Sequence, residues 1–340
     1  MPNIKTVAER AGVSLKTVSR VLSDPDAVAE KTRARVLAAA EELNFVPDRR
    51  AQAMRSGRSG VIGLLTDVVA TTPCSIDIVR GVEAALAERN MSLLIGNLEH
   101  RSETPSSILR SFQAGRVEGV LYAASYHREI DDFEPMHLPS VLVNCFTRDE
   151  RHLAIIPDEE DGGYLVGQHL LALGHRRIAY LSLAPDIEAT RLRLRGLERA
   201  MREAGVSVKK GSLLRAGQAH PGAFDQEEAF ARAWALLSDE QRPSAVFCGN
   251  DELAMQVYNA AAKLGLSIPG DLSVVGFDDH RLFSEGLRPG LTTVALPYTA
   301  MGRLAVETLL NGEISEGAPR TVRVKGPLVV RTSTGAAART

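Results

Sequence analysis

Apolar residues follow two different periodicities along the chain. In residues 1–46 they recur three or four positions apart, the spacing that places side chains on one face of a helix. This spacing predicts three short helices, TVAERAG, SLKTVSRVL and EKTRARVLAAAEELN, with Thr6 as the cap of the first and Gly12 as its turn residue. The core-facing positions of the third helix are expected to be Val36, Leu37, Ala40 and Leu43.

The second of these helices has one apolar face and one basic face. Ser14 is a suitable N-cap, because its hydroxyl can accept a hydrogen bond from an N–H of the first turn. The apolar face holds Val18, Val21 and Leu22. The opposite face and its flanks hold Leu15, Lys16, Thr17, Ser19 and Arg20. Two short helices joined by a glycine-containing turn are typical of a helix-turn-helix, whose second helix enters the major groove of DNA.

From residue 61 onward, apolar runs of strand length alternate with amphipathic stretches. The predicted strands are VIGLL, MSLLIGN, VEGVLYA, PSVLVN, RIAYLSL, SAVFCGN and LSVVGFDD. The predicted helices are 76–89, 161–173, 190–204, 251–264 and 298–311. This order indicates α/β structure with parallel sheets. RGVEAALAE at 80–88 is similar to RGLERAMRE at 195–203, which indicates two similar doubly wound halves.

Charge separates the two parts of the chain. Residues 1–60 contain eleven Lys and Arg against seven Asp and Glu, a net charge of +4, whereas the remaining 280 residues contain 29 against 35, a net charge of −6. This distribution is expected when only the first part touches a polyanion such as DNA.

Cysteine and histidine spacing indicates neither disulfides nor a metal site. The three cysteines are far apart, and the eight histidines lack the spacing of metal ligands. We therefore expect no cofactor. The chain shows no apolar run long enough to span a membrane and no signal peptide, so we expect a cytoplasmic protein.

The stretch NIKTVAERAGVSLKTVSRVLSDPDAVAEKTRARVLAAAEELNFVPDRRAQAMRSGRSGVIGLL resembles the opening of a lactose-repressor/galactose-repressor (LacI/GalR) family regulator. LGHRRIAYLS and LSVVGFDDHRLFSEGLRPGLTTV also look like family sequence. The resemblance implies an N-terminal all-α helix-turn-helix domain and an α/β effector domain of two periplasmic-binding-protein-like lobes, each a doubly wound parallel sheet. It implies a transcriptional repressor that binds a pseudo-palindromic operator as a homodimer and is controlled allosterically by a small molecule.

The same resemblance implies the domain boundaries. The expected segments are a DNA-binding domain over 1–46, a hinge over 47–59 and an effector domain over 60–340. Within the effector domain, the first lobe is expected to comprise about 60–158 and 292–320, and the second about 159–291 and 321–332.

Residues for DNA contact also follow from the resemblance. Leu15, Lys16 and Arg20 would read bases, with the leucine against a thymine methyl and the two cations on guanine acceptors. The phosphate contacts would come from Thr17, Ser19, Arg49 and Arg50. Met54 and Arg55 would enter the minor groove from the hinge helix. Met54 departs from the family pattern, in which a leucine is the wedge.

Effector contacts are expected where strands end, because ligands bind at the carboxyl ends of parallel strands. The candidates are Thr66, Asp67, Asn144, Arg193, Asn250, Asp278 and Tyr298. The resemblance implies that Arg193 and Asp278 grip effector hydroxyls with Asn250 beside them. A strand-end Asp or Asn can equally be a helix cap. The expected ligand is a sugar or sugar derivative; amine-bearing and nucleoside-like ligands stay open.

Some residues differ from the family pattern. Thr72–Ser75 replaces an aromatic stretch, and Leu296 stands where a polar residue is common.

An enzyme could use Asp278, Asp279 and His280, but no nucleophile motif or phosphate loop accompanies them. A solute-binding protein would share the two lobes but would require export. A DNA-binding regulator explains the N-terminal helices, whereas neither alternative does.

Overall fold

A computed structural model describes residues 2–23, 25–45, 59–67, 69, 75–98, 104–130, 133–183, 187–206, 213–215, 225–312 and 320–337. The chain divides into two compact units, Met1–Gly60 and Val61–Thr340, which are described separately. In the described ranges no helix is long and apolar enough to cross a membrane.

The first unit contains the three predicted helices. They are α1 (Ile4–Ala11), α2 (Leu15–Ser23) and α3 (Glu30–Glu42), with a 3-10 turn at Pro25–Ala27. Their buried core includes Val7, Ala8, Val18, Val21, Val36 and Ala40. Gly12 ends α1 in the left-handed conformation that favours glycine, with φ 63°, as a tight turn requires.

Two expectations for these helices were wrong. Asn3, not Thr6, caps α1: the Asn3 side chain accepts from the backbone of Lys5 and Thr6, and the Thr6 hydroxyl closes a capping box. Leu37 is 49% exposed, whereas Ala39 is buried. Because α3 packs on two short helices, its buried face is narrow. This face includes the small Ala39 and leaves the larger Leu37 outside it.

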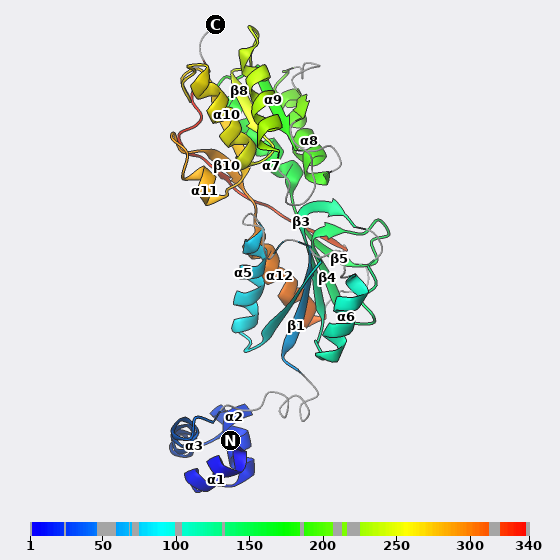
Figure 1. Ribbon diagram of the computed structural model, residues 1–340, viewed down its shortest axis with the longest axis vertical. Helices are drawn as coiled ribbons and strands as arrows, with labels where there is room; N and C mark the ends of the chain where they lie inside the picture. Colours follow the sequence, from blue (N-terminus) through cyan, green and yellow to red (C-terminus); the bar gives the residue numbers. More distant parts are fainter. Residues whose placement is uncertain are drawn as a thin grey trace. The chain divides into compact units, whose positions relative to one another are not determined.

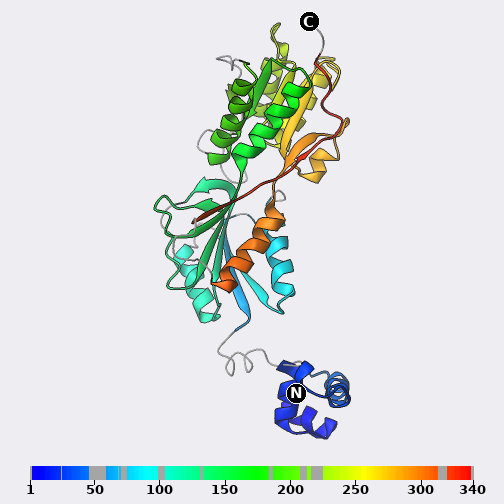
Figure 2. The same cartoon turned by 180° about the vertical axis from the view of Figure 1, so that it is seen from behind.

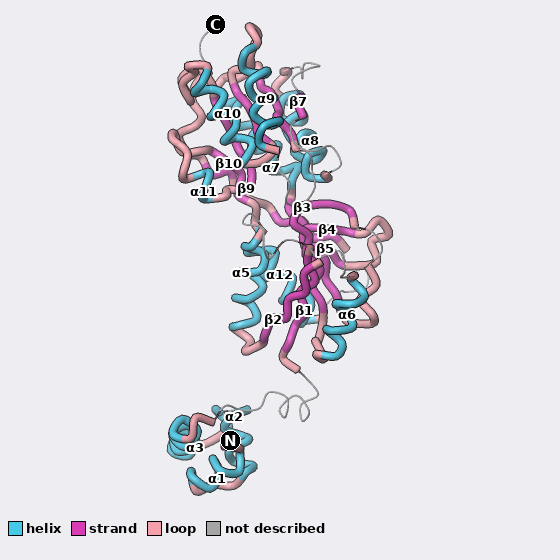
Figure 3. The backbone as a smooth tube through the Cα atoms, in the orientation of Figure 1, coloured by secondary structure: helices cyan, strands magenta, loops and turns pink. Residues whose placement is uncertain are grey.

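The second unit contains two six-stranded sheets flanked by helices (Figures 1 and 3). The first sheet is parallel throughout and has the order β11-β5-β4-β3-β1-β2. Its strands are β1 (Val61–Thr66), β2 (Ser92–Asn97), β3 (Val120–Glu129), β4 (Ser140–Phe146), β5 (Leu153–Pro157) and β11 (Thr321–Val324). Helices α5 (Ile76–Ala87) and α12 (Tyr298–Asn311) cover one face, and α6 (Pro105–Ala114) covers the other.

The second sheet has the order β12-β10-β9-β8-β6-β7, in which only β12 is antiparallel. Its strands are β6 (Ile178–Ser182), β7 (Leu213–Arg215), β8 (Ala245–Cys248), β9 (Ser273–Asp278), β10 (Thr292–Ala295) and β12 (Leu328–Val329). Its helices are α7 (Glu159–Ala172), α8 (Glu188–Glu203), α9 (Gln226–Ser238), α10 (Asp251–Lys263) and the short α11 (Arg281–Ser284). The predicted strands and helices are thus present, and the pattern missed the strands β5, β7, β10, β11 and β12 and the helices α6, α9 and α11.

The expected division between the lobes was wrong at two strands. Strand β10 pairs with β9, so residues 292–295 belong to the second sheet. Strand β11 pairs with β5, so residues 321–324 belong to the first. The chain therefore passes between the sheets just after β5, β10 and β11, and the crossings are visible from both sides of the molecule (Figures 1 and 2). Register with a neighbouring strand, which sequence alone does not show, sets these boundaries.

The two repeated stretches occupy equivalent places. The first lies in α5, after β1, and the second lies in α8, after β6. A side chain at Gly81 would collide with the backbone of Thr299 in α12, and one at Gly196 would collide with Glu160 of α7. Both repeats therefore use a glycine where one helix closely approaches another.

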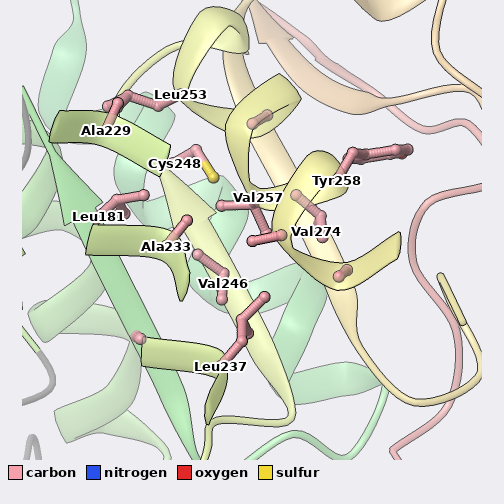
Figure 4. Packing of buried hydrophobic residues seen from close by; sticks show 14 of the residues in the cluster. Leu181, Ala229, Ala233, Leu237, Val246, Cys248, Leu253, Val257, Tyr258 and Val274 are labelled. Atoms are coloured by element: carbon pink, nitrogen blue, oxygen red, sulfur yellow. The ribbon is translucent and has the colours of Figure 1, made fainter. Parts of the chain in front are cut away.

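Apolar clusters lie on both faces of each sheet. Between the second sheet and helices α9 and α10, Val246 and Cys248 of β8 contact Leu237, Leu253 and Val257 (Figure 4). Strand β8 is buried along its whole length, as expected for a central parallel strand covered on both sides. These rigid cores hold the strand ends that carry the candidate residues.

Candidate effector and DNA sites

The outward surface of α2 presents the side chains expected to meet DNA. Leu15 is 48% exposed, and Lys16 and Arg20 are exposed beside it. The helix is capped as predicted, because Ser14 Oγ accepts from Thr17 N at 3.1 Å. The hydroxyls of Ser14 and Thr17 also lie 2.8 Å apart. Ser19 is half-buried.

The expected hinge contacts lie outside the described residues. They are Arg49, Arg50, Met54 and Arg55. Their roles stay predictions of the sequence.

At the carboxyl ends of the first sheet, several polar side chains are buried without partners. Thr66 Oγ1, at the end of β1, accepts and donates no hydrogen bond among the described residues. Asn144 in β4 has φ 58° and donates from Nδ2 to the carbonyl of Ala124 at 2.9 Å and to the Tyr298 hydroxyl at 3.3 Å. Its Oδ1 lacks a partner in the same part of the chain. Thr66, Asn144 and Tyr298 thus come from three elements to one end of one sheet.

Asp67 is a paired carboxylate. It accepts from the backbone N of Ser125 at 3.1 Å, from the Ser125 hydroxyl at 3.1 Å and from Arg128 Nη2 at 3.2 Å. All these donors come from the distal half of β3, which departs from regular pairing with β4 between Ala123 and Arg128. The irregular strand therefore supplies Asp67 with its counter-ion.

At the carboxyl ends of the second sheet, Arg193 is buried and surrounded by partners. Its Nε and Nη2 donate to Glu159 at 2.6 and 3.1 Å, and its Nη1 donates to the carbonyl of Gly249. The guanidinium lies 3.6 Å from the ring centroid of Phe277. Asp278 Oδ1 is 3.7 Å from Nη2. The donor fork expected to grip effector hydroxyls instead holds Glu159.

Glycines bring Glu159 and Arg193 together. A side chain at Gly163 of α7 would lie 2.0 Å from the carbonyl oxygen of Arg193, so only glycine allows α7 and α8 to approach this closely. Glu159 is the first residue of α7 and faces α8 at this contact. The buried ion pair therefore depends on helix packing.

The remaining candidates of the second sheet differ in their surroundings. Asn250 caps α10, because its Oδ1 accepts from Leu253 N at 2.9 Å. Asp251 accepts from Thr293 Oγ1 and His280 N, and burial raises its pKa to about 7. Asp278 has φ 109°, and its side chain is 14% exposed. Burial first, and then neighbouring carboxylates, raise the pKa of Asp278 well above its usual value.

His127 connects the two groups of residues. It lies in β3 of the first sheet, and its Nδ1 is 4.0 Å from Glu159 Oε1 in α7. The ring is buried, and neither nitrogen has a hydrogen-bond partner among the described residues. Burial, together with nearby guanidinium groups, lowers the pKa of His127 to about 3. It is therefore neutral at pH 7.

Comparison with known proteins identifies the family. Residues 3–48 match a model described as "Bacterial regulatory proteins, lacI family", and residues 168–334 match a periplasmic binding protein-like domain. The chain is 35% identical over 315 residues to the ribose operon repressor of Escherichia coli (strain K12), covering 92% of this chain and 93% of that protein. The chain belongs to the LacI family. The resemblance seen in the sequence is thereby confirmed.

Two further relatives extend the match over the whole chain. An HTH-type transcriptional repressor, PurR of Proteus mirabilis (strain HI4320), is 32% identical over 340 residues, with 98% of this chain and 97% of that protein covered. The solved lac repressor dimer bound to operator and the anti-inducer ONPF matches this fold with a TM-score of 0.75 at 27% identity, with 98% of this chain and 99% of that chain covered. This LacI-family member is a DNA-binding transcriptional regulator and not an enzyme.

Asp279 has a structural role in this regulator, which agrees with the conclusion that the protein is not an enzyme. It accepts from Arg331 Nη2 at 2.8 Å and from the Ser284 hydroxyl at 2.8 Å. It is thus tied to the C-terminal segment and α11, and the sequence pair Asp278–Asp279 does not act as two carboxylates on one substrate.

Sequence reasoning missed Glu159, His127, Ser125 and Arg128. Glu159 stands in the acidic run DEEDGG that follows the unpredicted strand β5, so recognising LAIIP as a strand would have placed it at a strand end. The other three lie in the part of β3 beyond the predicted VEGVLYA. No local pattern in SYHRE signals that the strand continues, because its irregular pairing is a tertiary feature.

Proposed function

We propose that this LacI-family regulator is a repressor whose effector is a sugar or sugar derivative bound between the carboxyl ends of its two sheets. The observation that carries the proposal is the set of buried polar atoms without hydrogen-bond partners at the end of the first sheet. Buried polar groups in native proteins are nearly always hydrogen-bonded. The unpaired atoms among the described residues here include Thr66 Oγ1, Ser75 Oγ, Asn144 Oδ1, Thr147 Oγ1 and both ring nitrogens of His127.

A ligand rich in hydroxyl groups fits this set. Hydroxyls both donate and accept, so they can pair with threonine and serine hydroxyls, an amide oxygen and a neutral imidazole. Asp278 at the opposite sheet adds an acceptor. One relative of this chain is a ribose operon repressor, which agrees with a sugar-responsive regulator.

For DNA, we propose that the exposed surface of α2 reads the operator. Leu15, Lys16 and Arg20 would contact base edges, and Thr17 and Ser19 would contact phosphates, with Arg49, Arg50, Met54 and Arg55 contributing from the hinge. The exposure of Leu15 supports this, because an apolar side chain on a basic surface suits a thymine methyl. A homodimer would place two such helices on the two half-sites of an operator. Binding to operator DNA would support a cytoplasmic location.

The DNA proposal is tested by selecting bound sequences from a random pool and measuring affinities for the selected operator. We expect Arg20→Ala to cost about 1–3 kcal/mol on the operator and to relax one base position per half-site. Arg10→Ala is the matched control, since Arg10 lies on α1 and pairs with Glu42 of α3. An equal loss on operator and random DNA for Arg20→Ala would contradict base reading.

The effector proposal is tested by operator affinity with and without sugars, starting with D-ribose and other pentoses, hexoses and disaccharides. Asp278→Asn keeps the shape of the side chain and removes its charge. We expect this variant to lose the response to the active sugar while binding operator normally without it. Arg193→Ala is unsuited to this purpose, because Arg193 neutralises Glu159 inside the protein. A full response of Asp278→Asn at wild-type sugar concentrations would place the effector elsewhere.

A further inference from the structure

The acidic run at the start of α7 has one member that differs from the others. Asp158 caps the helix at Asp161 N. Glu160 pairs with Arg195 and Arg199 on the surface, and Asp161 pairs with Lys325 at 2.7 Å. Glu159 alone is fully buried and faces Arg193. The run therefore places a single carboxylate at the candidate effector site.

Glu159 shares its cation with a second carboxylate. Arg193 faces two carboxylates, Glu159 at 2.6 Å and Asp278 at 3.7 Å. His127, on the other side of Glu159, is neutral at pH 7 because its pKa is lowered to about 3. The one guanidinium is thus shared between two carboxylates, and burial raises the pKa of Asp278 well above its usual value although Arg193 acts to lower it.

Three other arginines near the site form ion pairs of their own. Arg128 pairs with Asp67 at 3.2 Å, Arg331 pairs with Asp279 at 2.8 Å, and Arg191 pairs with Glu188. Arg323 also acts on His127 through its charge.

Most N–H donors of Arg193 are already used within the protein and are not available to an anionic ligand. A guanidinium has five N–H donors, and the three hydrogen bonds to Glu159 and Gly249 leave one N–H on Nη1 and one on Nη2, the latter nitrogen being 3.7 Å from Asp278 Oδ1. Its flat face lies on Phe277. The two-pronged edge with which arginine binds carboxylates and phosphates is occupied by Glu159.

We propose that Glu159 determines the charge class of the effector: polyols that offer hydroxyl or amino donors bind, and their carboxylate or phosphate derivatives are excluded. This inference rests on the proposed effector site. A ligand carboxylate or phosphate placed between the sheets would meet Glu159 and Asp278 and could not displace Glu159 from Arg193 without leaving a buried charge unpaired. Neutral hydroxyls or an ammonium group can instead donate to Asp278 and pair with His127.

The test is a charge series of matched ligands, measured as dissociation constants by calorimetry on the full-length protein. The probes are D-ribose, D-ribosamine, D-ribonate and ribose 5-phosphate, and D-glucose, D-glucosamine, D-gluconate and glucose 6-phosphate. In the wild type we expect every ligand that binds to be neutral or cationic, with its anionic derivatives at least tenfold weaker. This arm needs no mutation, so it holds even where a variant folds poorly.

The second arm uses Glu159→Gln with Glu160→Gln as the matched control. Both remove one negative charge from neighbouring positions of α7, but only Glu159 faces Arg193. We expect Glu159→Gln to tighten binding of the anionic derivatives by tenfold or more relative to their neutral parents, and Glu160→Gln to leave the ratio unchanged.

Each outcome separates this inference from the proposed function. An anionic derivative that binds the wild type as tightly as its parent, or equal effects of the two substitutions, would overturn the role of Glu159 while supporting a sugar effector. Absence of binding by every member of both series would overturn the sugar effector and, with it, the role of Glu159.

Discussion

The two sheets of the effector domain end in polar groups of opposite character. At the second sheet most buried polar side chains are partnered: Arg193 has Glu159, Asp251 has Thr293, and Asn250 caps a helix, whereas His280 Nδ1 lacks a partner among the described residues. At the first sheet, Thr66 Oγ1 and Asn144 Oδ1 lack partners in the same part of the chain. Unpartnered buried polar atoms are thus more frequent at the first sheet than at the second.

This difference separates stability from binding. Breaking a satisfied buried network leaves charges or donors without partners and costs folding free energy. An unsatisfied group costs free energy already and regains it when a ligand or water supplies the missing bond. The second sheet therefore forms a rigid framework, and the first sheet holds the groups that a ligand would complete.

The largest expected effect comes from breaking the framework. Arg193→Ala leaves the buried carboxylates of Glu159 and Asp278 without their cation, so we expect the free energy of unfolding to fall by about 3–5 kcal/mol. The measurement is urea unfolding of both variants against wild type. Arg195→Ala, two residues away on the exposed surface of α8, should cost about 0–1 kcal/mol. Similar losses for the two arginines would mean that the buried pair is not a framework.

A smaller effect on the free energy of unfolding is expected from protonation of His127, which lies in β3 beside Glu159 of α7. Its pKa is about 3 in the folded protein and 6.5 in the unfolded chain, so acid protonates the unfolded state first. Stability should therefore fall as the pH drops below about 7, and His127 alone should account for roughly 2 kcal/mol between pH 7 and pH 5.

His127→Gln removes this contribution and should make the free energy of unfolding less sensitive to pH by the same amount. The measurement is urea unfolding of wild type and variant at pH 7 and pH 5. An unchanged pH dependence in the variant would show that His127 is not buried in its neutral form.

The smallest effect is expected where a polar group lacks a partner. Thr66→Val removes an unpaired buried hydroxyl, so the free energy of unfolding should change by less than about 0.5 kcal/mol. Thr293→Val is the matched substitution in the second sheet and should cost about 1–3 kcal/mol, because it removes the 2.7 Å bond to Asp251. Thermal unfolding of the two variants compares them directly, and equal losses would remove the distinction between the sheets.

Local pattern was sufficient for most elements but not for their assembly. Six of the seven predicted strands are apolar runs that a parallel sheet buries, whereas β2 forms a sheet edge on which Leu94 and Ile95 are 40% and 41% exposed. Strand β11 was assigned to the wrong lobe because its short half-exposed sequence TVRV fits the edge of either sheet. Leu37 was placed in the core because helical spacing gives the direction of a side chain but not the width of the surface it meets.

The candidate site shows the same contrast between what local pattern predicts and what tertiary packing decides. Thr66, Asn144 and Asp278 were proposed because strand ends are visible in the sequence, and they lie in β1, β4 and β9, while Arg193, proposed from a family motif, lies in α8. Their roles toward an effector stay predictions. That Arg193 holds Glu159, and that Asp67 holds Arg128, could not be foreseen, because each pair joins residues 34 and 61 positions apart.

The sequence by itself determined the three-helix module, the basic face of α2, the alternation of strands and helices, and the family. These are local properties, since periodicity, caps and charge act over a few residues. Only the tertiary structure decided which polar groups are satisfied. Close packing of α7 on α8 at Gly163 and the irregular course of β3 bring Glu159, Arg193 and His127 together. The pairing of charges at the candidate site depends on those long-range contacts, because a buried charge without a partner destabilises the folded protein.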